Sequence, residues 1–113
     1  MGYDTPEAVL TLARQFMESR ILLTAAELNL FTLLAGKPST AAELSGDLRC
    51  DPRALTILLD ALAAMGLLEK QDGAYRTPRS AAPYLSGGSP RSVIPMVLHA
   101  ARLWESWSRL TPI

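Results

Sequence analysis

The sequence has a single histidine and a single cysteine, two of the side chains most often used as metal ligands, bases or nucleophiles. His99 lies in a helical segment between apolar residues, and Cys50 lies near the middle of the chain. A metal site needs several such ligands, and an activated nucleophile needs a base beside it. A lone histidine among apolar residues is typical of a packing residue, with a place in a substrate pocket as the alternative. The sequence therefore predicts no catalytic residue and no metal ligand in this chain.

Glycine-rich segments do not supply a binding loop either. The stretch SGGSP, residues 86–90, has no clear strand before it and no Lys-Ser or Lys-Thr after it, so it does not match a phosphate loop. The sequence contains neither a G-x-S-x-G motif nor a G-x-G-x-x-G motif. We therefore expect no cofactor-binding residue in this chain.

The composition indicates a soluble domain with no net charge. The 113 residues are 49% apolar and 19% charged, and eleven basic side chains balance eleven acidic ones. The high apolar content and low charge argue against disorder. The balance of basic and acidic side chains gives no general attraction to nucleic acid or to an anionic membrane. No apolar run is long enough to span a bilayer, and the start MGYDTPEAV lacks the pattern of a signal peptide. Together with the unpaired Cys50, these features favour a cytoplasmic protein.

The first third of the chain is predicted to be helical and unusually apolar. Thr5 and Pro6 are suited to the N-cap and first turn of a helix, which is followed by a second segment over about 20–28 and a short one over about 30–35. Gly36 is suited to end the last of these. Eleven of the fifteen residues from 21 to 35 are apolar, which is too many for one face of a surface helix. We therefore expect a partner surface to cover part of this region.

Residues 39–79 predict a winged helix-turn-helix. Thr40 and Glu43 have the spacing of a capping box at the start of one helix. Asp51 begins a second helix, whose leucines recur on one face until Gly66 ends it. The dipeptide Asp72-Gly73 then predicts a two-residue turn between two strands. Two helices followed by a hairpin make the winged form of this motif.

Many winged helices bind DNA, and the charge of this segment tests that function. Residues 39–79 hold five basic and six acidic side chains, a net charge of −1, whereas a DNA-binding surface needs cations for the phosphates. The outward positions of the second helix are Arg53, Thr56, Asp60, Ala63 and Ala64. A winged-helix transcriptional regulator, the alternative hypothesis, would have to use Arg53, Lys70 and Arg76 as phosphate contacts. The poor basic surface favours packing against protein instead.

Residues 80–91 are a connector rich in Pro, Gly and Ser, and residues 92–110 predict a final helix. Ser92 is expected to cap this helix, so that Pro95 lies in its first turn. Its apolar residues recur in steps of three and four, as in a heptad seam: Val93, Met96, Ala100, Leu103, Trp107 and Leu110. The fold class is therefore mainly α, a winged helix-turn-helix with one small β-hairpin between N-terminal helices over 5–35 and a C-terminal helix.

Three segments carry a resemblance to a known family: AAELNLFTLLAGKPSTAAELS, CDPRALTILLDALAAMGLLEKQDGAYRTP and YLSGGSPRSVIPMVLHAARLWESWSRL. Their order resembles the N-terminal dimerisation domain of S-adenosylmethionine-dependent O-methyltransferases of the caffeate, hydroxyindole and bacterial antibiotic type. The resemblance covers nearly the whole chain. It implies that residues 1–113 form a single dimerisation domain. It implies a winged helix that does not bind DNA. It also implies that the catalytic Rossmann-like domain, which holds S-adenosylmethionine and the catalytic base, is absent from this chain.

The resemblance further implies a homodimer in which residues 5–35 and 92–110 interlock across a two-fold axis. The expected interface residues are Leu12, Phe16, Ile21, Leu22, Leu28, Val93, Met96, Val97, Leu103, Trp104, Trp107 and Leu110. In that family the N-terminal helices reach into the partner's substrate pocket, and the last helix forms part of its wall. The residues that match such a role are Phe16, Met17, His99, Trp104 and Trp107, with simple interface or core packing as the alternative.

These observations lead to one hypothesis of function and two rivals. The hypothesis is a homodimerisation module of a small-molecule O-methyltransferase, with no activity alone and with S-adenosylmethionine as the cofactor of the full-length enzyme. One rival is the DNA-binding regulator. The other is a stand-alone scaffold protein, which differs only in whether a methyltransferase domain follows.

Overall fold

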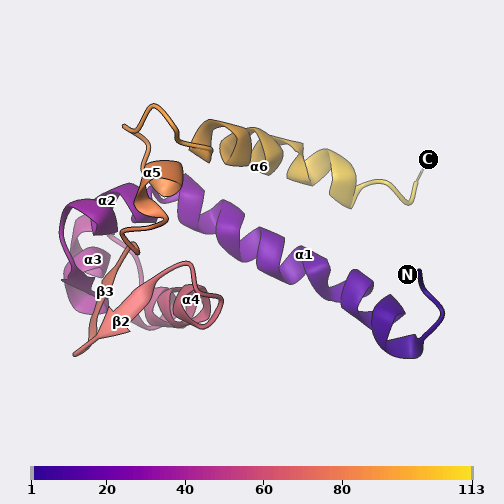
Figure 1. Ribbon diagram of the computed structural model, residues 1–113, viewed down its shortest axis with the longest axis horizontal. Helices are drawn as coiled ribbons and strands as arrows, with labels where there is room; N and C mark the ends of the chain where they lie inside the picture. Colours follow the sequence, from indigo (N-terminus) through magenta and orange to yellow (C-terminus); the bar gives the residue numbers. More distant parts are fainter. Residues whose placement is uncertain (1, 113) are drawn as a thin grey trace.

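The computed structural model describes residues 2–112, and its elements follow the chain from a long N-terminal helix to a C-terminal one (Figure 1). They are α1 (Pro6–Glu27), α2 (Leu30–Gly36), β1 (Ser39–Thr40), α3 (Ala41–Leu48), α4 (Pro52–Ala64), β2 (Glu69–Gln71), β3 (Ala74–Arg76), α5 (Ala82–Leu85) and α6 (Ile94–Ser108). The mainly α fold with a small β-hairpin is thereby confirmed. The radius of gyration is 15.8 Å, against about 13 Å for a compact domain of this length.

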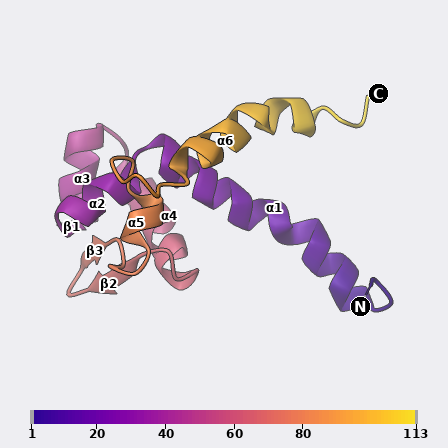
Figure 2. The same cartoon turned by 45° about the horizontal axis from the view of Figure 1, so that its top comes forward.

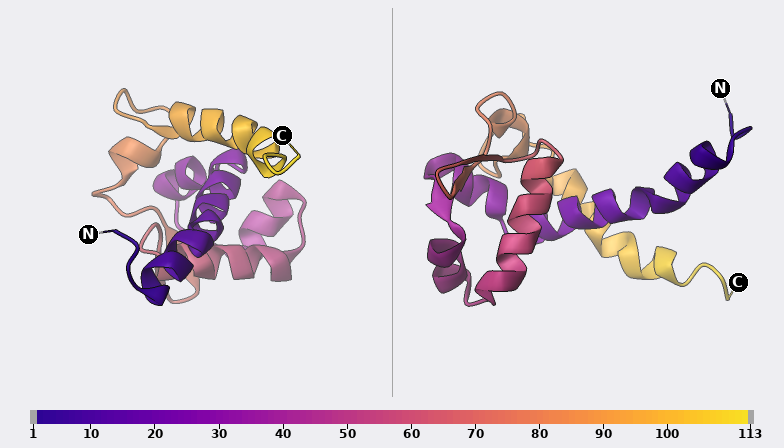
Figure 3. Two further views of the ribbon diagram at one scale, coloured as in Figure 1. Left: turned by 90° about the vertical axis from the view of Figure 1, so that its right-hand side faces the viewer. Right: turned by 90° about the horizontal axis from the view of Figure 1, so that it is seen from below.

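The elongation comes from α1 and α6, which leave the winged core (residues 39–79) on the same side. α1 packs against α6 near the core, and the two helices diverge towards the chain ends (Figures 2 and 3). α1 is one continuous helix of 22 residues, so the predicted division into two segments near residue 20 is wrong. No glycine or proline follows Pro6 within α1, and nothing therefore interrupts its backbone hydrogen bonds. Its predicted N-cap is confirmed, because the Ala8 amide donates to Thr5 Oγ1 at 3.2 Å.

The helices of the winged core begin as their sequence predicts. The amides of Thr40 and Glu43 donate to each other's side chains at 2.9 and 3.2 Å, which completes the capping box of α3. The Ala54 amide donates to the Asp51 carboxylate at 2.9 Å at the start of α4. Both caps satisfy amides that a helix leaves free in its first turn, so they fix where α3 and α4 start.

The wing is a three-stranded antiparallel sheet in the order β1-β3-β2. Asp72 and Gly73 form its turn with φ of 52° and 79°, as the sequence predicted, and Gln71 pairs with Ala74 across it. The central strand places Tyr75 in the core, where it is 2% exposed. The core joins α2, α4 and the wing through fully buried side chains, the largest being Tyr75, Phe31, Leu30, Leu34, Leu59 and Leu62.

Two local features of the C-terminal third differ from the prediction. The connector contains the four-residue helix α5, which ends in the buried Leu85. The N-cap of α6 is Val93 and not Ser92, although Ser92 Oγ accepts the Ile94 amide at 3.2 Å. Pro95 still lies in the first turn, where its missing amide leaves no helical hydrogen bond broken. Short helices and one-residue cap shifts depend on tertiary packing, which periodicity does not report.

Thr77 ties the end of the wing to α2 and provides a test of this packing. It is 4% exposed, and its hydroxyl donates to the Phe31 carbonyl at 2.7 Å. Thr77→Val keeps the shape and removes this buried hydrogen bond, so we expect a loss of about 1–2 kcal/mol in the free energy of unfolding. Urea denaturation at one fixed protein concentration measures it, with Thr77→Ser as the control that keeps the hydroxyl. A valine variant as stable as the wild type would contradict this role.

Candidate functional site

The N-terminal half of α1 carries large apolar side chains that the protomer leaves exposed. The buried residues of α1 are Leu23, Ala25 and Ala26, all in its last two turns. Before them, Phe16 is 56% exposed, and Val9, Leu10, Leu12 and Met17 are close to half exposed. Figure 1 shows this half of the helix extending away from the winged core. The helix therefore presents an apolar surface that residues 2–112 leave uncovered.

α6 presents a second surface of the same kind. The buried residue of α6 is Ile94, at the start of the helix. Met96 is 69% exposed and Trp107 is 67% exposed, and Val93, Leu103 and Leu110 are also exposed. Seven of the twelve predicted interface residues are thus exposed in the protomer: Leu12, Phe16, Val93, Met96, Leu103, Trp107 and Leu110.

Four other predicted interface residues serve the protomer itself. Ile21, Leu22, Leu28 and Val97 are partly buried and pack against the protomer's hydrophobic core. These four residues lie where α1 and α6 approach the winged core. Periodicity alone could not distinguish such inward positions from an outer face. Trp104 is also half-buried.

An aromatic cleft lies between α1 and α6. Its volume is about 460 Å³, and its lining is Phe16, Ser19, Leu22, Leu23, Val97, Ala100, Leu103, Trp104 and Trp107. It brings together three of the five predicted pocket-wall residues, Phe16, Trp104 and Trp107. Met17 and His99 are exposed and do not belong to this lining. The volume is within the range of small-molecule sites, and a wall made almost wholly of apolar groups equally suits the side chains of a protein partner.

Sequence reasoning missed exposed apolar residues that lie off the predicted seams. Leu10 adds to the surface of α1, and Ile57 is 64% exposed on the outer face of α4. Leu10 and Ile57 fall outside the periodic stripes from which the candidates were chosen. Exposure of such residues follows from the absence of a covering element, which a one-dimensional pattern does not contain.

Two cations of the wing, Lys70 and Arg76, are paired with carboxylates. Asp60 Oδ1 accepts from Tyr75 Oη at 2.5 Å and from Lys70 Nζ at 2.9 Å. Arg76 pairs with Glu69 across the hairpin at 3.1 Å. The hydrogen bond from Tyr75 and then that from Lys70 hold the pKa of Asp60 below its ordinary value. Two of the three side chains that a DNA-binding regulator would need are therefore already engaged.

Within residues 2–112 the structure has no group of three or more potential metal ligands and no helix long and apolar enough to cross a membrane. The residues present do not fit S-adenosylmethionine either. A nucleotide-type cofactor site of the Rossmann kind needs a parallel sheet with a glycine-rich turn into a helix. The sheet here is antiparallel with strands of two or three residues, and Gly87 and Gly88 follow the short helix α5.

Comparison with known proteins identifies relatives for nearly the whole chain. The family model for the O-methyltransferase dimerisation domain matches residues 10–87. The tetracenomycin polyketide synthesis 8-O-methyl transferase TcmO of Streptomyces glaucescens is 41% identical over 108 residues, which are 94% of this chain and 32% of that protein. The chain thus spans about a third of the length of this relative.

Solved structures show the same fold. An O-methyltransferase family protein from Burkholderia thailandensis superimposes with a TM-score of 0.88 at 32% identity, over 98% of this chain and 33% of that one. Human N-acetylserotonin methyltransferase, in complex with SAM, gives a TM-score of 0.80 at 30% identity, over 99% of this chain and 35% of that one.

Asp60 links the wing to α4, and this link predicts a dependence of stability on pH. A carboxylate whose folded-state pKa is lowered contributes stability above its ordinary pKa of about 3.9, and this stability is lost as the pH falls through the folded-state value. We therefore expect the melting temperature of the wild type to fall more steeply below about pH 4 than that of Asp60→Asn. Thermal melts between pH 3 and 7 measure this, with Asp47→Asn on α3 as the control. Equal slopes for wild type and Asp60→Asn would contradict it.

Proposed function

This chain belongs to the family of O-methyltransferase dimerisation domains, and we propose that residues 5–35 and 92–110 interlock with those of a second copy to form a homodimer. The winged core over 39–79 then serves as the base from which both helices project, and residues 80–91 connect it to α6. The whole forms a single dimerisation domain.

The observation that carries this proposal is the excess of exposed surface. The chain exposes 7884 Å², whereas a compact monomer of 12.2 kDa exposes about 6,100 Å². The difference, roughly 1,800 Å² per protomer, is of the size that an obligate dimer buries on each subunit. Its apolar part is concentrated on α1 and α6, on Val9, Leu10, Leu12, Phe16 and Met17 of the first and on Met96, Leu103 and Trp107 of the second.

We further propose that the full-length protein is a small-molecule methyltransferase using S-adenosylmethionine. The support is the similarity to TcmO and to human N-acetylserotonin methyltransferase, whose structure contains SAM. The methyl donor and the transfer chemistry would then belong to residues beyond those described here. In such an enzyme Phe16, Trp104 and Trp107 could contribute the dimerisation domain's part of a substrate-pocket wall, together with Met17 and His99. The exposed, unpaired Cys50 fits a reducing compartment, and we propose the cytoplasm.

Two substitutions on α6 test the dimer. Leu103→Asp and Trp107→Asp each place a charge in the proposed interface, where an unpaired, desolvated charge costs several kcal/mol. Both side chains are well exposed in the protomer, so the fold should be kept. We expect the wild type to sediment at about twice 12.2 kDa and both variants to sediment as monomers with unchanged helix content.

Ile57→Asp is the matched control, because Ile57 is exposed (64%), like the two α6 residues, but lies on α4, outside the proposed interface. It should remain dimeric. If Leu103→Asp and Trp107→Asp both keep the mass of the wild type, this placement of the interface is wrong.

A DNA-binding regulator, the alternative function, would bind duplex DNA, whereas a dimerisation domain would not. Affinity that rests on Lys and Arg contacts to phosphates falls steeply with salt. Because Lys70 and Arg76 are paired with Asp60 and Glu69, we expect no binding of a labelled duplex at low salt. Sedimentation of the chain with that duplex measures it, and salt-dependent co-sedimentation would favour the regulator.

A further inference from the structure

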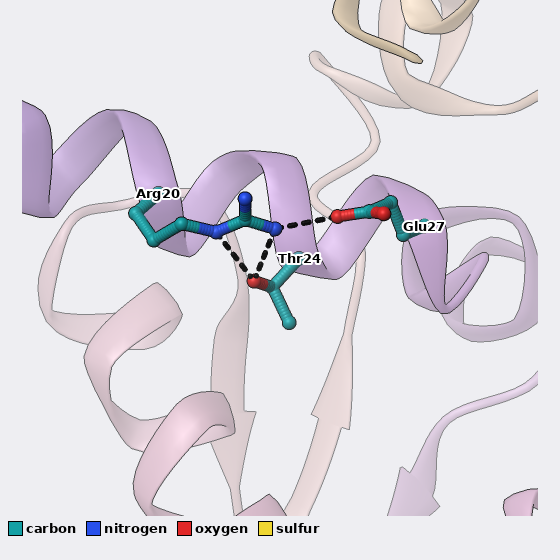
Figure 4. A network of polar contacts seen from close by, with 3 residues as sticks. All are labelled: Arg20, Thr24 and Glu27. Atoms are coloured by element: carbon teal, nitrogen blue, oxygen red, sulfur yellow. Dashed lines mark hydrogen bonds and ion pairs between the residues drawn. The ribbon is translucent and has the colours of Figure 1, made fainter. Parts of the chain in front are cut away.

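A polar network on α1 holds Arg20 at the point where this helix leaves the winged core (Figure 4). Arg20 Nε and Nη2 donate to Thr24 Oγ1 at 3.2 and 3.1 Å, and Nη2 also donates to Glu27 Oε1. Thr24 and Glu27 lie one and two turns further along the same helix, so the guanidinium is held along the helix surface. Its Cζ lies 5.0 Å from the centre of the Trp104 ring on α6.

The stacking of Arg20 on Trp104 joins α1 to α6, whereas the three hydrogen bonds of Arg20 lie within α1. The buried anchor of α6 is Ile94 at its start, and Val97 and Leu98 pack against the core in the next turn. Trp104 is nearly two turns beyond Leu98, in the second half of α6. The position of the outer half of α6 therefore depends on the contacts of Trp104.

Trp104 also lines the aromatic cleft, beside Phe16 and Trp107. Its ring thus has two neighbours of different kinds, the Arg20 guanidinium and the open cleft. An arginine is suited to this position because a planar guanidinium can stack on an aromatic ring and still donate hydrogen bonds from its edge. A lysine ammonium cannot do both with the same geometry.

We propose that Arg20 is a positioning residue that sets the direction of α6 through Trp104 and thereby shapes the aromatic cleft for a second copy of this chain. The inference rests on the proposed homodimer for its occupant, and on the network of Thr24, Glu27 and Trp104 for its mechanism. Arg20 acts through Trp104, so its removal changes the cleft without removing any of the apolar groups that line it.

The experiment uses Trp107→Phe as the background, since the chain has two tryptophans and Trp104 then provides the whole tryptophan signal. In this background Arg20→Met, Arg20→Lys and Thr24→Val are compared by near-ultraviolet circular dichroism, by tryptophan emission and by the dimer dissociation constant from sedimentation. Arg14→Met, which removes an exposed arginine from the same helix, is the matched control.

We expect Arg20→Met to weaken the Trp104 dichroism, shift its emission and raise the dimer dissociation constant at least about five-fold, with far-ultraviolet dichroism unchanged. Thr24→Val should act in the same direction and less strongly. Arg20→Lys keeps the charge and should fail to restore the Trp104 spectrum, which separates stacking from charge alone. If Arg20→Met unfolds the chain, the lysine variant carries the test.

Three results would overturn the inference. They are an unchanged Trp104 spectrum in Arg20→Met, full recovery of the spectrum by lysine, and a changed spectrum with a dissociation constant within two-fold of the background. A wild-type chain, with Trp107 intact, that is monomeric at every concentration would instead contradict the proposed homodimer. The Trp104 spectra in the Trp107→Phe background would still show whether Arg20 positions the ring.

Discussion

The structure depends on one constraint: within residues 2–112, the large apolar side chains on the first half of α1 are left about half exposed. A helix of about twelve residues is marginal in water, and helices in proteins owe most of their stability to packing of an apolar face. Here that face exists, with Val9, Leu12 and Phe16 at helical spacing, and the winged core reaches only the last two turns. The same holds for α6 beyond Leu98. An element that exposes its packing face requires a partner, and a second copy offers the same two helices in return.

The winged core differs from the two projecting helices, because its apolar core is buried within the protomer. Its hydrophobic core lies between α2, α4 and the sheet, and the buried hydroxyls of Tyr75 and Thr77 are hydrogen-bonded within the protomer. Asp60 occupies a position on α4 from which a DNA-binding protein would present a cation, and it engages Lys70 of the wing. The core therefore acts as a rigid support for the projecting helices. Its resemblance in shape to DNA-binding domains is one of architecture, since the surface chemistry differs.

Local rules predicted most of the fold, and the errors arose where tertiary packing decides. The caps at Thr5, Thr40 and Asp51 and the turn at Asp72-Gly73 are short-range features, and each was found in place. The four-residue helix α5 was not predicted, because it does not follow from a periodic pattern. The unbroken course of α1 was not predicted either, although no glycine or proline interrupts that helix after Pro6. For the candidate site, periodicity identified apolar positions on α1 and α6 but could not separate Ile21 and Val97, which pack on the core, from Phe16 and Trp107, which remain exposed.

The central claim is that a second copy covers the projecting half of α1, and hydrogen exchange tests it most directly. Amide exchange would be followed by mass spectrometry at protein concentrations far above and far below the dimer dissociation constant. The account predicts that amides of residues 9–18 are protected at high concentration and exchange rapidly after dilution, while those of Leu30–Leu34 in the core stay protected throughout. Protection of residues 9–18 that does not change with concentration would contradict it.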